Sequence, residues 1–348
     1  MNKEWNKRIS RPLAGLLLFA LVMSGAAFVA AAANAAELPG EGKTVQAGYT
    51  AGLLEERFQN QVLAIGLERL GYDIAEMVQM DVPALHLAVG QGDVDFIAAH
   101  WDPLQQTFYE RAGGPNEVSR VGVLVDGCLQ GYLVDKKTYD EKGVHSLDQL
   151  TDPATAALFD GDKDGKADLS GCPPGWGCER VVEHHLDAYK LRDTVTHNQG
   201  QFDVMAADTI ARFKAGEPVL YYTYTPHWIS QVLVPGRDVE WLAVPFTSLP
   251  EEQQAMNLDT TSPDGKNIGF PVNAMRVVAN TKFLENNPAA AKLFELAVIP
   301  VGDVNNQNFL LHEGETSYED VRRHAEAWIA AHQSEFDGWI EEAKKAAI

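Results

Sequence analysis

The ten residues GCPPGWGCER combine residue types that are typical of a binding site rather than of ordinary core packing. Cys172 and Cys178 enclose Trp176, which stands between two glycines, and the helix-like run CERVVEHHLDAYKL begins at Cys178. The main-chain amides of Gly177 and Cys178 are therefore expected at a helix N-terminus, where an anion is stabilised. Gly177 also has no side chain to keep a ligand away from the backbone. The segment predicts an aromatic face beside an anion site.

Two further aromatic residues stand where predicted strands end. Trp101 ends VDFIAAHW, and Tyr224 ends PVLYYTY. Ligands of α/β proteins bind beyond the carboxyl ends of such strands, although each ring taken alone is equally compatible with packing. With Trp176 they supply three aromatic faces, the surface that recognises a quaternary ammonium group. Three faces at about 2 kcal/mol each give about 6, whereas micromolar binding needs about 8 kcal/mol. A carboxylate on the ligand, bound at the anion site, is expected to supply the remainder.

The first 35 residues have the pattern of a cleaved signal peptide. A basic start is followed by the apolar stretch 13–33 and by Ala33-Asn34-Ala35, which fits the small-x-small cleavage rule. An uncleaved membrane anchor is the alternative, because the stretch approaches the length that spans a bilayer. We expect cleavage after Ala35 and a periplasmic, soluble mature protein.

Export also determines how the three cysteines are interpreted. In an oxidising compartment Cys172 and Cys178 are predicted to form a disulfide, and Cys128 is predicted to be a buried free thiol. An exported thiol–disulfide oxidoreductase using Cys172 and Cys178 is the alternative from another class. The five intervening residues, two of them proline, fit a structural bridge better than a C-x-x-C redox pair. No nucleophile elbow, P-loop or dinucleotide fingerprint occurs, so we expect no enzyme activity and no cofactor.

Composition and periodicity bound the partners and the fold class. The formal charge of −21 argues against nucleic acid as a partner, because phosphate binding needs a basic surface. Helical and strand patterns alternate, which predicts an α/β fold with largely parallel sheets. The predicted helices are residues 55–72, 82–92, 178–191, 202–216 and two C-terminal segments, and the predicted strands include 94–101 and 218–224.

Two apolar runs, 121–135 and 268–280, are candidate crossings between two domains. If both cross, residues 36–133 and 272–348 form lobe 1, and residues 134–271 form lobe 2. Such a layout predicts a cleft between the lobes that closes around a ligand by hinge motion.

The acidic segment DGDKDGKADLSG matches part of a calcium-binding loop. Its twelfth position, where a bidentate glutamate is usual, is Gly171, and Glu179 is a substitute only if the fold brings it near. A structural Ca²⁺ site and a solvated acidic turn therefore both remain open. The candidate ligands are Asp160, Asp162, Asp164 and Asp168.

Several segments resemble one family over essentially the whole chain that follows residue 35. AELPGEGKTV, FDGDKDGKADLSGCPPGWGCE, DTVTHNQG, YYTYTPHW, GFPVNAMRVVAN and NPAAAKLF are similar to the glycine betaine/proline betaine-binding proteins of osmoprotectant ABC importers. The resemblance implies a two-lobed periplasmic-binding-protein fold (type II-like) with the ligand in the interlobe cleft. It also implies delivery to an inner-membrane permease with its ATPase, and a monomeric receptor.

In that family the cation lies in a box of three tryptophans, and the carboxylate is bound by main-chain amides and one histidine. Trp101 and Trp176 match two box positions. The amides fall at Gly177 and Cys178. The third box position is Tyr224 here, and the histidine position is Gln105.

Tyrosine keeps a π face and glutamine keeps a hydrogen-bond donor, so the ligand class is expected to persist. Choline, carnitine and dimethylsulfoniopropionate remain alternative ligands.

Overall fold

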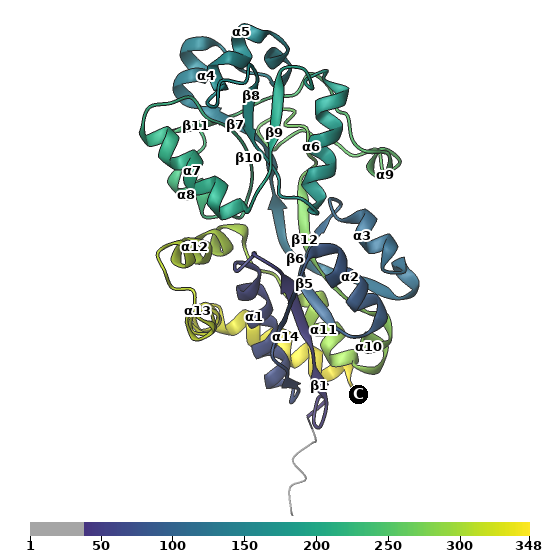
Figure 1. Cartoon of the computed structure of the whole chain (residues 1–348). Coiled ribbons are helices and arrows are strands. Elements are labelled where there is room, and N and C mark those ends of the chain that lie inside the picture. Colours follow the sequence, from purple (N-terminus) through teal and green to yellow (C-terminus); the bar gives the residue numbers. More distant parts are fainter. Residues whose placement is uncertain (1–37) are drawn as a thin grey trace, which may run out of the picture. The chain divides into compact units, whose positions relative to one another are not determined.

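Two mixed five-stranded sheets form the framework of the computed structural model, which describes residues 38–348 (Figure 1). The predicted signal peptide, residues 1–35, lies outside the described residues. Within the described part of the chain, no helix is long and apolar enough to cross a membrane.

The first sheet has the strand order β4-β2-β5-β12-β6. β2 runs parallel to β4 and β5, whereas β12 runs antiparallel to β5 and β6. Its strands are β2 (Ala47–Thr50), β4 (Val78–Met80), β5 (Phe96–Asp102), β6 (Val118–Cys128) and β12 (Asn273–Asn280). The short strands β1 (Thr44–Val45) and β3 (Asp73–Ile74) form a separate parallel pair.

The second sheet has the order β11-β7-β10-β8-β9. β10 is parallel to β8 and antiparallel to β7, which is also antiparallel to β11. Its strands are β7 (Gln130–Asp135), β8 (Ala167–Ser170), β9 (Val195–Asn198), β10 (Leu220–Tyr224) and β11 (Val239–Trp241). In Figure 1 this sheet occupies the upper, teal part, above β5, β6 and β12.

The expectation of largely parallel sheets is wrong. In the first sheet β12 is antiparallel to both of its neighbours, and in the second sheet β7 is antiparallel to both of its neighbours. Each of these two strands follows a segment of the other sheet in the chain. β7 follows β6 after the single residue Leu129, so it enters the second sheet directly from the first. β12 enters the first sheet after β11 of the second. Periodicity detects the strands but not the direction in which such a connecting strand runs.

The two predicted crossings coincide with these connections. The run 121–135 contains the end of β6 and all of β7, and 268–280 contains β12. The lobe boundaries 133/134 and 271/272 stay predictions. The strands themselves change sheet between Cys128 and Gln130 and between Trp241 and Asn273.

The described chain contains fourteen α-helices, and the predicted helical segments are among them. α2 begins with a proline in its first turn and ends at Gly92 in the left-handed region, as its sequence favours. The helices are α1 (Glu56–Arg69), α2 (Val82–Gln91), α3 (Gln106–Arg111), α4 (Lys136–Lys142), α5 (Pro153–Ala156), α6 (Gly177–Ala188), α7 (Phe202–Lys214), α8 (Ile229–Val232), α9 (Glu251–Gln254), α10 (Thr281–Asn286), α11 (Pro288–Leu296), α12 (Val301–His312), α13 (Tyr318–Ala331) and α14 (Gln333–Ala346).

Candidate ligand-binding cavity

One cavity collects the six side chains and amides that the sequence analysis selected for ligand binding. Its walls come from both halves of the framework: the β5–α3 turn lies on one side, and β7, β10 and the start of α6 lie on the other. The lining residues are Leu53, Val82, Trp101, Leu104, Gln105, Gln130, Trp176, Gly177, Cys178, Tyr222 and Tyr224.

The three predicted box residues lie beside one another in this cavity. The ring centroids of Trp101 and Tyr224 are 5.5 Å apart with planes at 88°. Those of Trp176 and Tyr224 are 6.1 Å apart at 65°. Phe202, at the start of α7, stacks on Trp176 with centroids 5.9 Å apart. The rings therefore present faces and edges toward a common space and are held by a further aromatic side chain.

The space between the rings is small. The cavity has a volume of about 30 Å³, and a single water molecule needs roughly 10–15 Å³ by the same measure. Trp101 and Tyr224 are only 6% and 5% exposed. A methylated cation can therefore enter only if the walls move apart, and walls that belong to two different sheets are able to do so.

The turn after β5 positions Gln105 beside Trp101. The Trp101 N–H donates to Gln105 Oε1 at 3.0 Å, and the Gln105 N–H donates to the Trp101 carbonyl at 2.8 Å. Because Oε1 is engaged in this way, the amide end Nε2 is the part of the side chain that remains to donate to a ligand.

The start of α6 carries the two predicted carboxylate-binding amides. α6 begins at Gly177, and its cap residue Trp176 offers no side-chain oxygen to the first amides. These N–H groups therefore lack the usual side-chain cap at the positive end of a twelve-residue helix. A Cβ on Gly177 would lie 2.8 Å from Leu104 Cγ and 3.0 Å from the Leu104 carbonyl oxygen. Glycine is thus required because the β5–α3 turn approaches the helix closely.

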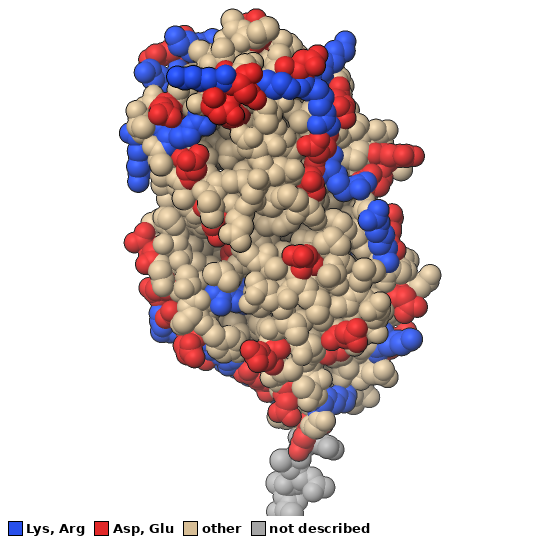
Figure 2. Space-filling model, in the orientation of Figure 1, with Lys and Arg blue, Asp and Glu red and all other residues tan. Residues whose placement is uncertain are grey.

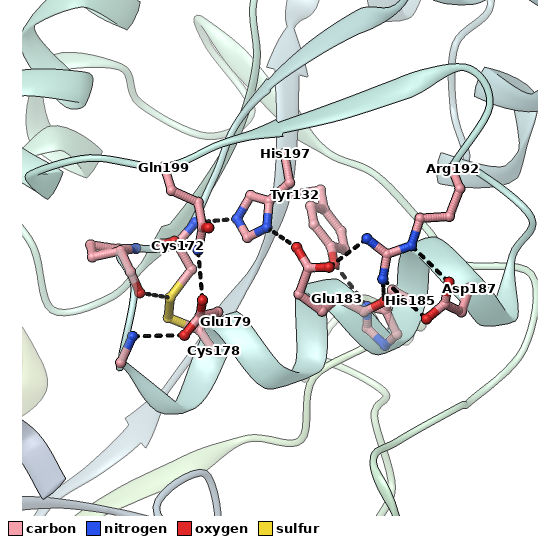
Figure 3. A network of polar contacts seen from close by, with 12 residues as sticks. Tyr132, Cys172, Cys178, Glu179, Glu183, His185, Asp187, Arg192, His197 and Gln199 are labelled. Carbon is pink, nitrogen blue, oxygen red and sulfur yellow. Dashed lines mark hydrogen bonds and ion pairs between the residues drawn. A yellow bond between two sulfur atoms is a disulfide. The ribbon is translucent and has the colours of Figure 1, made fainter.

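The predicted disulfide between Cys172 and Cys178 is present, and Cys128 is a buried free thiol. Burial raises the pKa of the Cys128 thiol to about 12. Glu179 fixes the tip of the disulfide loop, because its carboxylate accepts the Gly175 N–H at 2.6 Å (Figure 3). The loop that carries Trp176 is therefore held by a covalent bond and by hydrogen bonds.

Two residues from the β9 region connect the same loop to the second sheet (Figure 3). Gln199 Nε2 donates to the Cys172 carbonyl and to Glu179 Oε1, both at 3.0 Å. The Cys172 N–H donates to His197 Nε2 at 2.9 Å, and His197 Nδ1 donates to Glu183 at 2.6 Å. His197 therefore accepts from the loop through Nε2, and Glu183 of α6 orients its ring. The sequence did not predict these hydrogen bonds between the disulfide loop, Gln199, His197 and α6.

A buried carboxylate lies directly behind the box. The Tyr224 hydroxyl donates to Glu55 Oε1 at 2.7 Å, and Glu55 is only 8% exposed. Burial raises the pKa of the Glu55 carboxyl, and the nearby His227 opposes that shift. His227 Nε2 lies 3.9 Å from Glu55 and 3.4 Å from Asp203. The side of the box formed by Tyr224 is therefore rich in acceptors.

Sequence reasoning missed two residues that line the cavity, Tyr222 and Gln130, and two that contact its aromatic rings, Phe202 and Glu55. Tyr222 could have been predicted from the sequence, because it stands two residues before Tyr224 and therefore on the same face of β10. Gln130 was the one amide in the apolar run 121–135. Phe202 and Glu55 gave no local signal, since only the tertiary fold brings them to the rings.

The acidic loop places three of its four candidate ligands together. One carboxylate oxygen each from Asp160, Asp162 and Asp168 lies within 4.8 Å of the other two. Asp164 is not in that group. Glu179 is not in it either, since its oxygens accept from Gly175 and Gln199.

Gly171, at the twelfth position of that loop, cannot be replaced by any residue with a side chain. A Cβ on Gly171 would lie 1.9 Å from the ring of His197, so a glutamate cannot stand there. The loop carboxylates accept backbone N–H groups, for example Gly165 N–H to Asp160 at 3.0 Å and Gly161 N–H to Asp168 at 2.8 Å. The calcium site remains a prediction, and the geometry is equally that of a self-bonded acidic turn.

The face of the described chain in Figure 2 carries Lys and Arg intermixed with Asp and Glu, rather than gathered in one basic patch. Ion pairs such as Arg192 with Asp187 at 2.7 Å and Arg322 with Glu68 at 2.6 Å are consistent with this distribution. The surface shown therefore lacks the concentrated positive charge that phosphate backbones require.

Comparison with known proteins gives closely related sequences. The family model described as the substrate binding domain of an ABC-type glycine betaine transport system matches residues 43–331. The glycine betaine-binding periplasmic protein OusX of Dickeya dadantii (strain 3937) is 50% identical over 311 residues, covering 89% of this chain and 93% of the relative. The glycine betaine/proline betaine-binding periplasmic protein of Escherichia coli (strain K12) is 49% identical over 312 residues, covering 90% and 93%.

A solved structure supports the fold independently. Lactococcal OpuAC, in its closed-liganded conformation complexed with glycine betaine, superposes with a TM-score of 0.65. The match covers 86% of this chain and 99% of that protein at 20% sequence identity. At this identity the likeness establishes the two-lobed α/β fold and nothing finer.

Proposed function

Because the chain belongs to the family of substrate-binding domains of ABC-type glycine betaine transport systems, we propose that it captures glycine betaine or proline betaine in the cavity described above. The members of this family are substrate-binding components of transporters, not enzymes. The observation that carries the proposal is that Trp101, Trp176, Tyr224, Gln105 and the first amides of α6 line one cavity.

The aromatic walls are suited to the cationic end of a betaine. A quaternary ammonium group has no N–H to donate, so it is recognised by π faces rather than by acceptors. Trp101, Trp176 and Tyr224 provide these faces at ring separations of 5.5 and 6.1 Å. The buried Glu55 accepts the hydrogen bond of the Tyr224 hydroxyl and so holds that ring in place. A cation between the rings is therefore favoured by the π electrons of three oriented faces.

The polar wall is suited to the carboxylate end. The amides of Gly177 and Cys178 stand at the uncapped start of α6, and Gln105 offers Nε2 from the opposite side. Charge-assisted hydrogen bonds of this kind are worth about 1.5–3 kcal/mol each. They supply the free energy that aromatic faces alone do not provide.

The receptor role follows from the family. We infer that the mature protein is exported by the signal peptide 1–35 and acts in the periplasm as a monomer. It delivers its ligand to an inner-membrane permease with its ATPase. Closing of lobe 1 (36–133 and 272–348) on lobe 2 (134–271) is the step that encloses the ligand, and no chemical reaction is involved.

The experiment that tests this function is a titration of the mature protein with glycine betaine, followed by calorimetry and by tryptophan fluorescence. We expect saturable binding at micromolar concentration and a change in the emission of Trp101 and Trp176, because both rings would contact the cation. Choline is the matched second titrant, since it carries the same trimethylated cation without a carboxylate.

The outcomes separate the ligand classes. Tight betaine binding with much weaker choline binding supports the proposal in full. Tighter binding of choline, carnitine or dimethylsulfoniopropionate would retain the receptor role and change the cargo. Absence of a signal with glycine betaine up to millimolar concentration would overturn the proposed ligand.

A further inference from the structure

A buried glutamine in the wall of the cavity has an amide nitrogen without a hydrogen-bond partner in the described chain. Gln130 is the first residue of β7, is fully buried and lines the cavity. Its Oε1 accepts the Tyr222 hydroxyl proton at 2.6 Å. Its Nε2 is buried and makes no hydrogen bond within residues 38–348. A buried donor without a partner is a free-energy penalty that native structures rarely retain without a reason.

Strand register places this amide next to the aromatic box. In the antiparallel pair of β7 and β10, Gln130 stands directly opposite Tyr224. Residues opposite each other in a ladder project from the same face, and so does Tyr222, two positions away from Tyr224. The amide of Gln130 is therefore a cross-strand neighbour of the ring that closes one side of the box.

Tyr222 determines which end of the amide is available. Because its hydroxyl donates to Oε1, the two N–H groups of Gln130 are the end without a partner. A quaternary ammonium cation cannot accept these hydrogen bonds, whereas a carboxylate oxygen can. The orphan donor thus matches the half of a betaine that the aromatic rings do not recognise.

We propose that Gln130 Nε2 donates a hydrogen bond to the carboxylate of the bound ligand and is a specificity-determining residue of this receptor. The inference rests on the proposed function, since it assigns a further contact within the same cavity. Gln130 acts with Gln105 and with the amides of Gly177 and Cys178, so the carboxylate is bound from both sheets. A cation without a carboxylate leaves Nε2 unpaired, and the site therefore selects against it.

The test compares Gln130→Met with the wild-type protein in titrations with glycine betaine and with choline. Methionine has a similar length and no donor, so the wall stays filled while the hydrogen bond is lost. We expect glycine betaine affinity to fall by roughly 10- to 100-fold, the range for a hydrogen bond to a charged group. Choline affinity should change by less than about threefold, since choline has no carboxylate to accept the bond.

A second variant, Gln130→Glu, keeps the acceptor for the Tyr222 hydroxyl and replaces the donor by another acceptor. A carboxylate facing a carboxylate is repulsive, so this variant should lose more betaine affinity than Gln130→Met. The matched control is Gln307→Met. Gln307 is a buried glutamine of α12 whose Nε2 also lacks a partner in the described chain, but it lies in a different cavity, beside Phe58 and Trp328. We expect this control to bind betaine as the wild type does.

The results distinguish failure of the inference from failure of the proposed function. If the wild type does not bind glycine betaine, the proposed function fails and the inference fails with it. If the wild type binds and Gln130→Met binds equally well, only the inference is overturned. An equal loss for betaine and choline would also overturn it, because that pattern indicates a packing role. A loss confined to betaine, with the affinity of Gln307→Met unchanged, supports it.

Discussion

The half-buried ring of Trp176 is fixed more firmly than packing alone requires. It stacks on Phe202, lies across the box from Tyr224, and belongs to a loop closed by the Cys172–Cys178 disulfide. A ring that is already immobilised loses little rotamer freedom when a ligand binds. We therefore expect Trp176→Ala to weaken glycine betaine binding by more than about 2 kcal/mol, which is roughly 30-fold. Unchanged affinity by calorimetry would remove Trp176 from the site.

Gln105 permits a direct test of where the carboxylate lies. Its Oε1 accepts the Trp101 N–H, so any replacement must accept there and still donate toward the cavity. A neutral histidine has one ring nitrogen for each role. Gln105→His is expected to tighten glycine betaine binding by up to about tenfold. Gln105→Leu, which loses both roles, should weaken it. If neither variant alters the affinity, the carboxylate does not lie at this turn.

At the scale of elements, the contact between the β5–α3 turn and the start of α6 joins the two sheets. Gly177→Ala would place a methyl group 2.8 Å from Leu104 Cγ. Overpacking of this kind costs about 1–3 kcal/mol, so betaine affinity should fall roughly 5- to 100-fold. Gly338→Ala in α14, where a Cβ meets nothing within 4 Å, is the control and should leave affinity unchanged. Equal affinities for both variants would mean that this contact is absent from the ligand-bound form.

The start of α1 makes stability depend on pH. Burial raises the pKa of Glu56 from its usual 4.5 to about 8, although its Oε2 accepts the Thr50 N–H at 2.7 Å. A carboxyl with a raised folded-state pKa contributes stability that is fully present below about pH 4.5 and is lost as the pH rises toward 8. Each pKa unit corresponds to about 1.4 kcal/mol.

The unfolding free energy of the wild type should therefore fall between pH 5 and pH 8, as measured by chemical denaturation. In Glu56→Gln this fall should be smaller by a few kcal/mol. The amide oxygen of glutamine can still accept the Thr50 N–H. Glu335→Gln in the exposed first turn of α14 serves as the control for removing one charge. Parallel pH profiles for Glu56→Gln and the wild type would contradict the assignment.

At the scale of the whole molecule, sequence patterns locate the elements but not their partners. Apolar spacing predicts α1, α2, α6 and α7, because helix periodicity is local. The antiparallel direction of β7 and β12 depends on which sheet the chain has just left, and no local pattern encodes that. The box residues at strand ends were predictable for the same reason that the strands were. Gln130 stands out as the one amide of the run 121–135, but its place opposite Tyr224 arises only from strand register. Glu55 gave no local signal, since its role arises only from tertiary contact.

Enclosure of the site makes movement of the two sheets a requirement for binding. The cavity of about 30 Å³ has one wall from the β5–α3 turn and another from β7, β10 and α6, and the rings of Trp101 and Tyr224 are nearly inaccessible to solvent. A ligand must therefore enter while these walls are apart. Within residues 38–348 the chain crosses between the sheets only at Leu129 and ahead of β12.

Small-angle X-ray scattering of the mature protein should accordingly give a smaller radius of gyration with saturating glycine betaine than without it. Sodium acetate, which has the carboxylate but no cation, should leave the radius of gyration unchanged. Glycine betaine should also leave the radius of Trp176→Ala unchanged at concentrations below the dissociation constant of that variant. A radius that is the same with and without bound betaine would mean that the ligand enters by side-chain movement within a molecule whose two sheets stay in place.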